Sequence, residues 1–198
     1  MDLKAVEQEV ASLMNTAGWV DLEERAFWLL AHGDQAPPRE TLEGTLPLLR
    51  LWRYRRNGLF TSWTVLAPVP GVRGPRPLVR EITWDRPLDL KRDASGVRRL
   101  KRRQSARPSL RIRDVPLERS MLEPHLQWAA HLPPGLPAPP RPVDAGEDVH
   151  GVEGFRSMTH LRFEWAGDGP PGWISTRLRF EALLRFLEDS LRERESDR

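Results

Sequence analysis

The dipeptide Asn57-Gly58 is the feature that most restricts how this chain can fold. It lies between two arms, residues 48–56 and 59–66, and the second arm is rich in threonine, tryptophan, valine and phenylalanine. A two-residue turn of type I′ needs positive φ at both central residues, which Asn-Gly adopts at low cost. The pattern therefore predicts a β-hairpin. The alternative is a helix that begins near Thr45 and is capped by Gly58.

Alternating polarity predicts three further strands. Residues 78–84 place Val79, Glu81 and Thr83 on one face and Arg80, Ile82 and Trp84 on the other. Around residues 110–114, Leu110 and Ile112 alternate with Arg111 and Arg113; later, Leu161, Phe163 and Trp165 alternate with Arg162 and Glu164. A period of two is typical of strands with one buried face.

Helical spacing of apolar residues predicts four helices. The first covers residues 2–14, and the second opens at Asp21 and closes at Gly33. A third is expected over residues 117–129, where Pro124 marks a kink or a boundary. The last begins at Phe180, after a short extended piece at residues 173–178.

Together these elements predict an α+β fold, a mostly antiparallel sheet (hairpin and meander) packed with N-terminal helices, a middle helix and a C-terminal helix. Residues 1–198 are expected to form a single domain, with the helices on one face of the sheet. Six prolines within residues 133–142 favour a proline-rich surface crossing over residues 133–146. Residues 193–198 are expected to be a frayed tail.

Composition narrows the classes of protein that fit. The chain has no cysteine, which excludes disulfides, thiolate metal sites and a cysteine nucleophile. Its first ten residues are amphipathic and partly acidic, unlike a signal peptide. No apolar run approaches the ~20 residues that a membrane span needs. We therefore expect a cytoplasmic protein that does not contact a membrane.

The positive charge of the chain is local. Eight basic residues and no acidic residue lie between positions 98 and 113: Arg98, Arg99, Lys101, Arg102, Arg103, Arg107, Arg111 and Arg113. Of the 31 basic residues, 23 remain outside this segment, against 28 acidic residues. Such a segment attracts phosphates, but it has no aromatic residue for base stacking. A solvated loop that pairs with acidic surface is the favoured interpretation.

Three further motifs resemble known functional patterns but match them incompletely. Residues 167–172 match a dinucleotide-binding glycine pattern, but two prolines remove the N–H donors that bind pyrophosphate, which favours a tight loop. The element Asp89-Leu90-Lys91 lacks the earlier carboxylate that a metal-dependent nuclease needs.

The acidic and histidine-bearing segment from Asp144 to His160 could supply metal ligands, with His150 and His160 on one sheet face across a turn. No recognised ligand spacing is present there, so solvated charges on a loop edge are the favoured interpretation. No cofactor is expected, and the chain offers no sequence pattern that indicates catalysis.

Eight tryptophans are many for this length, and most recur at core spacing. Trp173, after a Pro-Pro-Gly loop, is the candidate for an exposed partner contact, because protein interfaces favour aromatic residues. The end of the chain, with Leu161-Arg162-Phe163-Glu164-Trp165, then Pro170-Pro171-Gly172-Trp173 and a leucine-rich helix, resembles the ends of small bacterial immunity or accessory proteins. The resemblance covers about thirty residues.

These observations predict a non-catalytic bacterial interaction protein that binds another macromolecule in an accessory or immunity-type role. A protein is the favoured partner. One alternative is a nucleic-acid-associated protein that uses the basic segment 98–113. A second alternative is a metal-dependent hydrolase around Asp144–His160. The candidate contact residues are Arg98, Arg99, Lys101, Arg102, Arg103, Arg107 and Trp173.

Overall fold

The structure is a computed structural model that describes residues 22–55, 58–71, 76–94, 108–130, 147–156, 159–169 and 171–196. Several predicted features lie outside the described residues. These are the helix at residues 2–14, Asn57 of the turn, the six basic residues from Arg98 to Arg107, and the proline-rich residues 133–146.

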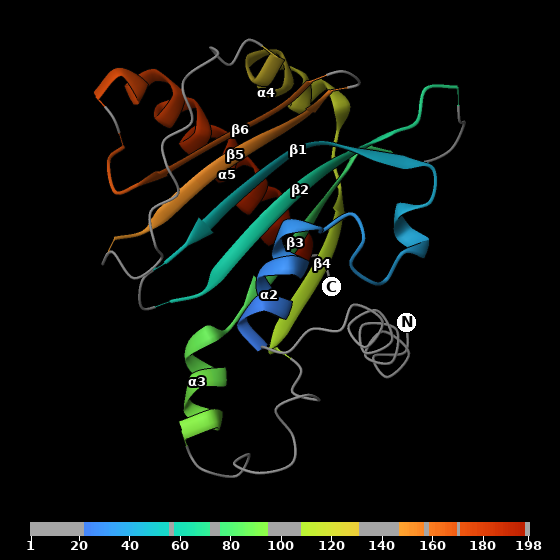
Figure 1. The fold of residues 1–198 in the computed structure, drawn as a ribbon. Helices are drawn as coiled ribbons and strands as arrows, with labels where there is room; N and C mark the ends of the chain where they lie inside the picture. Colours follow the sequence, from blue (N-terminus) through green and yellow to red (C-terminus); the bar gives the residue numbers. More distant parts are fainter. Residues whose placement is uncertain are drawn as a thin grey trace.

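One six-stranded antiparallel sheet forms the centre of the fold (Figure 1). The strands are β1 (Thr45–Tyr54), β2 (Phe60–Pro68), β3 (Leu78–Trp84), β4 (Leu110–Pro116), β5 (Val149–Arg156) and β6 (Thr159–Ala166). Their order across the sheet is β4-β3-β2-β1-β5-β6. The first four strands form a meander, and the β5–β6 hairpin adds to the free side of β1.

The predicted hairpin is confirmed, because β1 pairs antiparallel with β2 from Tyr54↔Phe60 to Thr45↔Pro68. Its predicted type I′ turn is wrong, because Gly58 does not have the positive φ that this turn requires. The helical alternative for this region is therefore wrong. The strands predicted at residues 78–84, 110–114 and 161–165 are also present. Strand β5 was not predicted, since its charged residues and glycines look like a loop.

The helices are α2 (Leu22–Ala31), α3 (Arg86–Ala94), α4 (Arg119–Ala130, with Pro124 inside it) and α5 (Ile174–Ser196), with 3-10 turns at Glu40–Leu42 and Pro171–Trp173. The α+β class with N-terminal, middle and C-terminal helices is thus confirmed. The extended piece predicted at residues 173–178 is wrong, because α5 begins at Ile174. Thr176 already belongs to the buried stripe of that helix, so packing overrides the local strand preference of isoleucine and threonine.

Helices cover both faces of the sheet, whereas the sequence predicted one covered face. Helix α5 lies behind the sheet in Figure 1 and α2 lies in front of it. We call these the α5 face and the α2 face. The core on the α5 face joins strand residues Leu49, Leu51, Trp63, Val65, Val79, Val152, Phe163 and Trp165 to Phe180, Leu183, Leu184, Leu187 and Leu191 of α5. On the other face, Ala26, Leu29 and Leu30 of α2 pack on Phe60, Ile82 and Trp84.

A buried arginine fixes β3 and β4 to the segment after α2. The side chain of Arg80 is fully buried and donates to both carboxylate oxygens of Asp114, at 2.7 and 2.6 Å. Its other N–H groups donate to Thr41 Oγ1 at 3.0 Å and to the carbonyl oxygens of Gly33, Ala36 and Pro38. A buried guanidinium is tolerated only when its donors are satisfied in this way. We call this group the Arg80 cluster.

Candidate partner-binding site

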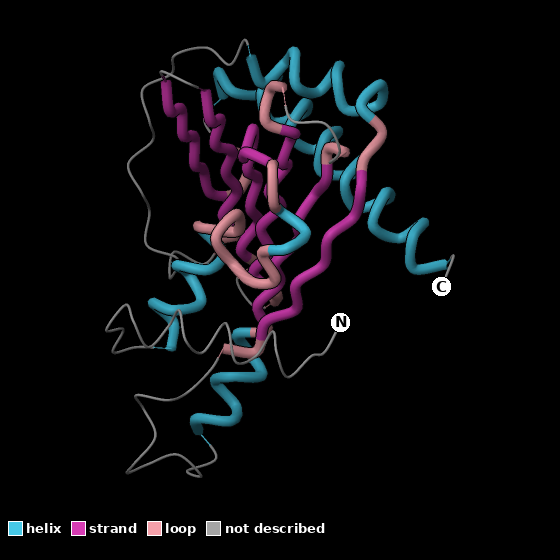
Figure 2. The backbone as a smooth tube through the Cα atoms, turned by 90° about the vertical axis from the view of Figure 1, so that its right-hand side faces the viewer, coloured by secondary structure: helices cyan, strands magenta, loops and turns pink. Residues whose placement is uncertain are grey.

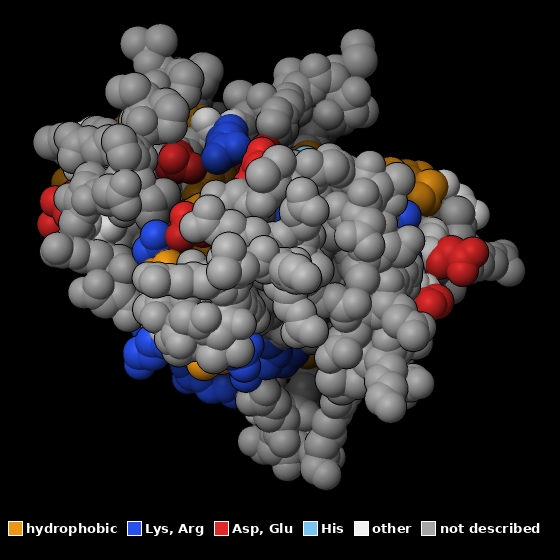
Figure 3. Space-filling view, turned by 60° about the horizontal axis from the view of Figure 1, so that its bottom comes forward, with side chains coloured by type: hydrophobic (Ala, Val, Ile, Leu, Met, Phe, Trp, Pro, Cys, Tyr) orange, Lys and Arg blue, Asp and Glu red, His pale blue; other side chains and the backbone are white. Residues whose placement is uncertain are grey.

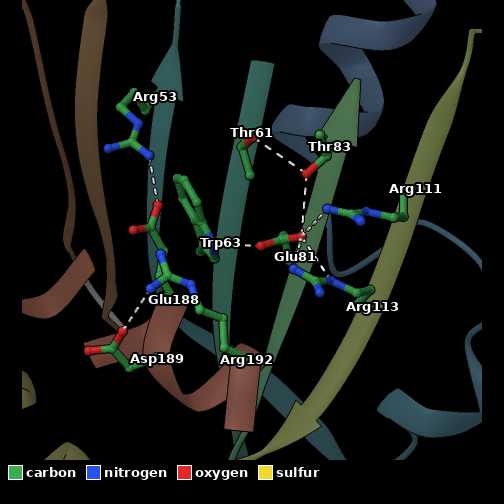
Figure 4. Close-up of polar contacts among 10 residues, drawn as sticks. All are labelled: Arg53, Thr61, Trp63, Glu81, Thr83, Arg111, Arg113, Glu188, Asp189 and Arg192. Atoms are coloured by element: carbon green, nitrogen blue, oxygen red, sulfur yellow. Dashed lines mark hydrogen bonds and ion pairs between the residues drawn. The ribbon is translucent and has the colours of Figure 1, made fainter. Parts of the chain in front are cut away.

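A row of four polar side chains crosses the α5 face at one end of the meander (Figure 4). The register pairs Arg53 of β1 with Thr61 of β2, Thr61 with Thr83 of β3, and Thr83 with Arg111 of β4. We call these four residues the Arg–Thr row. Neighbouring strands lie about 4.8 Å apart, so the backbones of the two arginines are separated by roughly 14 Å.

The centre of the row consists of hydroxyl groups. The Oγ1 atoms of Thr61 and Thr83 lie 3.4 Å apart, and Thr83 Oγ1 donates to Glu81 Oε1 at 3.4 Å. A hydroxyl can donate and accept, and it rotates to suit its neighbour. The row therefore places two cations at the ends of a short stretch of adaptable hydrogen-bonding groups.

Glu81 lies next to the row, two residues before Thr83 on the same face of β3, and it is buried. Arg113 donates to Glu81 Oε1 from Nε at 3.0 Å and from Nη2 at 2.7 Å, and Trp63 Nε1 donates to Oε2 at 3.1 Å. Arg111 Nη2 reaches Oε1 only at 3.8 Å, which is too long for a hydrogen bond. We call Trp63, Glu81 and Arg113 the Glu81 cluster; within it, both carboxylate oxygens already have close donors.

Arg111 is the most open member of the row. Its side chain is 60% exposed, compared with 22% for Arg53 and 23% for Arg113. Its distance to Glu81 is too long for a hydrogen bond, so Glu81 does not occupy its N–H donors. It can therefore donate to a group that arrives from outside.

Helix α5 adds charges of both signs beside the row. Arg53 Nη2 donates to Glu188 Oε1 at 2.7 Å, and its guanidinium lies 5.8 Å from the centre of the Trp63 ring. In the next turn of α5, Arg192 Nη1 lies 3.5 Å from Asp189 Oδ1, and both side chains are well exposed. Four arginines and three carboxylates thus meet here (Figure 4).

The basic segment enters the described structure at β4. Arg111 and Arg113, its last two members, both lie on the α5 face because odd-numbered residues of β4 share that face. Figure 3 shows Lys and Arg side chains gathered along the lower part of the molecule in that view. The site therefore contains the last two residues of the basic segment.

Trp173 lies elsewhere, at the start of α5. It is half-buried, and its ring meets those of Phe163 and Trp165 edge-on, with centroid distances of 5.4 and 6.2 Å. It therefore belongs to the margin of the core on the α5 face. Its contact Trp165 pairs with His150, which pairs with Arg53, so Trp173 lies beyond the β1 end of the Arg–Thr row.

The acidic and histidine-bearing segment becomes strand β5 and the start of β6. The register pairs His150 with Trp165 and Phe155 with His160, so positions 150 and 160 lie on opposite faces of the sheet. The predicted shared face of these histidines is wrong. Glu153 lies on the α2 face as the ion-pair partner of Arg50. Among the residues that the structure describes, no three histidines or carboxylates gather to hold a metal ion.

Asp89, in the Asp89-Leu90-Lys91 element, uses its carboxylate to accept hydrogen bonds from protein groups and is not arranged as a metal ligand. Its side chain is buried and accepts hydrogen bonds from Trp84 Nε1 at 2.9 Å and from Ser109 N and Oγ, both at 2.7 Å. It therefore fastens α3 to the start of β4. Sequence reasoning missed this contact, which joins α3, before the basic segment, to Ser109 within it.

Two histidines have shifted pKa values. Burial lowers the pKa of His150, and the neighbouring Arg53 lowers it further. His150 stacks on Trp165 and meets Phe180 edge-on. Burial also lowers the pKa of His125, which stacks on Phe186. Both side chains favour the neutral form in the folded protein.

Comparison of the chain with protein-family models, with curated proteins and with solved structures gave no match in any of the three. In the described part of the chain, no helix combines the length and the apolar character that crossing a membrane would need. Inference about function therefore starts from the geometry above.

Proposed function

We propose that this protein is a non-catalytic binding protein, and that its partner is another protein with an acidic surface that docks at the Arg–Thr row. The observation that carries the proposal is Arg111, a 60% exposed arginine whose distance to Glu81 is 3.8 Å. Arginine is enriched at protein interfaces because its planar head binds carboxylates in a bidentate way. An accessory or immunity-type role is consistent with such binding.

The mixture of charges favours a protein over a nucleic acid as the partner. Glu188 and Asp189 lie on the same side of the sheet as the arginines and would repel a phosphate backbone. A protein can place its own cations and carboxylates against such an alternating pattern. Nucleic-acid binding through residues 98–113 remains the second candidate, because Arg111 continues that run of cations.

Affinity capture with matched variants tests the proposal. The bait is the full chain as wild type, as Arg111→Glu, or as Arg119→Glu, a control on α4 whose side chain is 83% exposed. We expect one or more proteins from nuclease-treated native-host lysate to be retained by wild type and by Arg119→Glu, and to be lost with Arg111→Glu. Purified retained protein should then bind directly, with an affinity that falls as salt rises.

Two outcomes would overturn the proposal. One is that the three baits retain the same proteins. The other is that material is retained from untreated lysate but not from nuclease-treated lysate, while an oligonucleotide binds the chain directly, which would favour the second candidate.

A further inference from the structure

Among the strands that the structure describes, β4 is at an edge of the sheet. Within the described chain its strand neighbour is β3, on one side. Asp85 N donates to Ser109 O, and Leu117 N donates to Pro77 O. These bonds fix the alternation: odd-numbered residues of β4 direct their N–H and C=O groups to β3, and even-numbered residues direct theirs outward. Ile112 and Asp114 therefore present backbone donors and acceptors on the outer edge.

Figure 2 looks at the molecule from this side. Strand β4 runs there from the upper right to the lower centre, with the C-terminal part of α5 to its right and the segment after α2 to its left, and it is the last strand in the sheet order. An exposed edge of this kind is a template for pairing with another chain.

The side chains of β4 determine which chain fits. An antiparallel strand added at this edge would meet Arg111 and Arg113 at positions without direct backbone hydrogen bonds, where side chains approach each other most closely. Carboxylates at alternate residues of the added strand would lie beside these two guanidiniums on the α5 face. The residue between them would lie beside Ile112, which packs on the core of the α2 face.

A second copy of the same strand is disfavoured in the registers that overlap the two arginines. In registers centred on Ile112 or Arg113, an arginine of one copy would face an arginine of the other, and like charges directly opposite each other destabilise a strand pair. The same arginines that oppose self-pairing would stabilise an acidic strand. Charge complementarity therefore selects the occupant.

We infer that the partner contributes an extended segment with the pattern acidic–apolar–acidic, and that this segment adds to β4 as a seventh strand. The inference rests on the proposed function and specifies how the partner binds. Backbone bonds to Ile112 and Asp114 supply the docking, and carboxylate contacts with Arg111 and Arg113 supply the selectivity.

Synthetic peptides test the inference on the full chain. The probe is fluorescently labelled Glu-Val-Glu-Val-Glu-Val-Glu, and its control is the same peptide with N-methyl groups on the amides of one edge, made once for each edge. Binding is measured by fluorescence anisotropy with wild type, Arg111→Glu and Arg119→Glu. We expect the probe to bind wild type and Arg119→Glu, and to bind Arg111→Glu roughly tenfold or more weakly. One of the two N-methylated peptides should lose a similar factor.

The possible failures separate the inference from the proposed function. If both N-methylated peptides bind as well as the probe while Arg111→Glu still weakens binding, strand addition is wrong and the docking site of the proposed function stands. If the probe fails to bind, the inference is wrong, and the capture experiment decides the proposed function. If Arg111→Glu leaves probe binding unchanged, neither holds at this site. If a thymidine oligonucleotide binds more tightly than the probe and depends on Arg111, the partner is a nucleic acid.

Discussion

Two arginine–carboxylate groups lie back to back on the same pair of strands. On the α2 face, β3 supplies the cation, Arg80, and β4 supplies the carboxylate, Asp114. On the α5 face the roles are reversed, since β3 supplies Glu81 and β4 supplies Arg113 and Arg111. The first group is closed, because the guanidinium is fully buried; the second is open, because Arg111 is 60% exposed.

The difference shows that burial, more than residue type, separates a structural ion pair from a binding site. The N–H groups of Arg80 donate to Asp114, Thr41 and three carbonyl oxygens, so they are not available to a partner. Arg111 retains its hydration and its donors. The same two strands therefore have one face whose charges hold the fold together and one edge whose charges can recognise another molecule.

The largest expected effect is the loss of stability when Arg80, in the closed group on the α2 face, is replaced. Arg80→Met should reduce the free energy of unfolding by about 3–5 kcal/mol, because it removes the cation from a partly buried carboxylate and the donor from several carbonyl oxygens. Urea unfolding followed by tryptophan fluorescence measures this loss. Arg119→Met, at an exposed position, is the control. A loss below about 1 kcal/mol for Arg80→Met, the typical range of a surface ion pair, would contradict the structural role of the Arg80 cluster.

An intermediate effect on stability is expected for Glu81, the carboxylate in the open group on the α5 face. Glu81→Gln should lower the free energy of unfolding by about 1–3 kcal/mol, because Arg113 loses a charged hydrogen-bond acceptor. It should also strengthen binding of the acidic peptide, since the charge of Glu81 then no longer competes for Arg113. Urea unfolding and anisotropy measure the two results, with Glu123→Gln on α4 as the control. A weaker peptide affinity for a folded Glu81→Gln would count against this picture of competition.

A smaller effect on stability is expected for the open arginine itself. Arg111→Glu should change the free energy of unfolding by about 1 kcal/mol or less, since exposed ion pairs contribute little. Its effect on binding should be much larger than its effect on folding. Thermal unfolding and peptide anisotropy on the same preparation give both values. Large destabilisation would show that Arg111 belongs to the structural group instead.

The smallest effect is a pH dependence of stability from His150. Its folded pKa lies below the unfolded value of about 6.5. As pH falls through the unfolded value, the unfolded chain takes up a proton that the folded chain does not, so stability should decrease until the lowered folded pKa is passed. His150→Phe should flatten this slope in urea unfolding between pH 5 and 7.

The charges around His150 allow a check on this assignment. Arg53 and Arg177 lower its pKa, while Asp148 and Glu181 raise it. His125 contributes a slope of the same sign, so His125→Phe is measured in parallel. An unchanged slope in both variants would show that neither histidine is responsible.

Much of the meander could be predicted from the sequence, because its signals are local. The two arms around residues 57–58 predicted the first hairpin, although not its turn type, and the alternation of Val79, Glu81 and Thr83 with Arg80 and Ile82 predicted the two faces of β3, as the register confirms. Strand β5 could not be predicted, since its glycines resemble a loop. Gly151 is there for another reason: the ring of Trp52 occupies the space that a Cβ atom would need.

The candidate site itself was only partly predictable. The basic segment was evident from composition, but the pairing of Glu81 with Arg113 joins residues 32 positions apart and depends on the β3–β4 register. The closed state of Arg80 likewise depends on a segment more than 40 positions earlier in the chain. Such long-range contacts leave no local pattern, so a sequence shows which charges exist but not which of them are already paired.

Amide hydrogen exchange at β4, resolved by residue, tests the central claim most directly. The amides of Ile112 and Asp114 point outward, and those of Arg111 and Arg113 bond to β3. With the acidic peptide or the purified partner bound, exchange at Ile112 and Asp114 should slow about tenfold or more, while Arg111 and Arg113 change little. Unchanged exchange at Ile112 and Asp114 in a saturated complex would contradict the account.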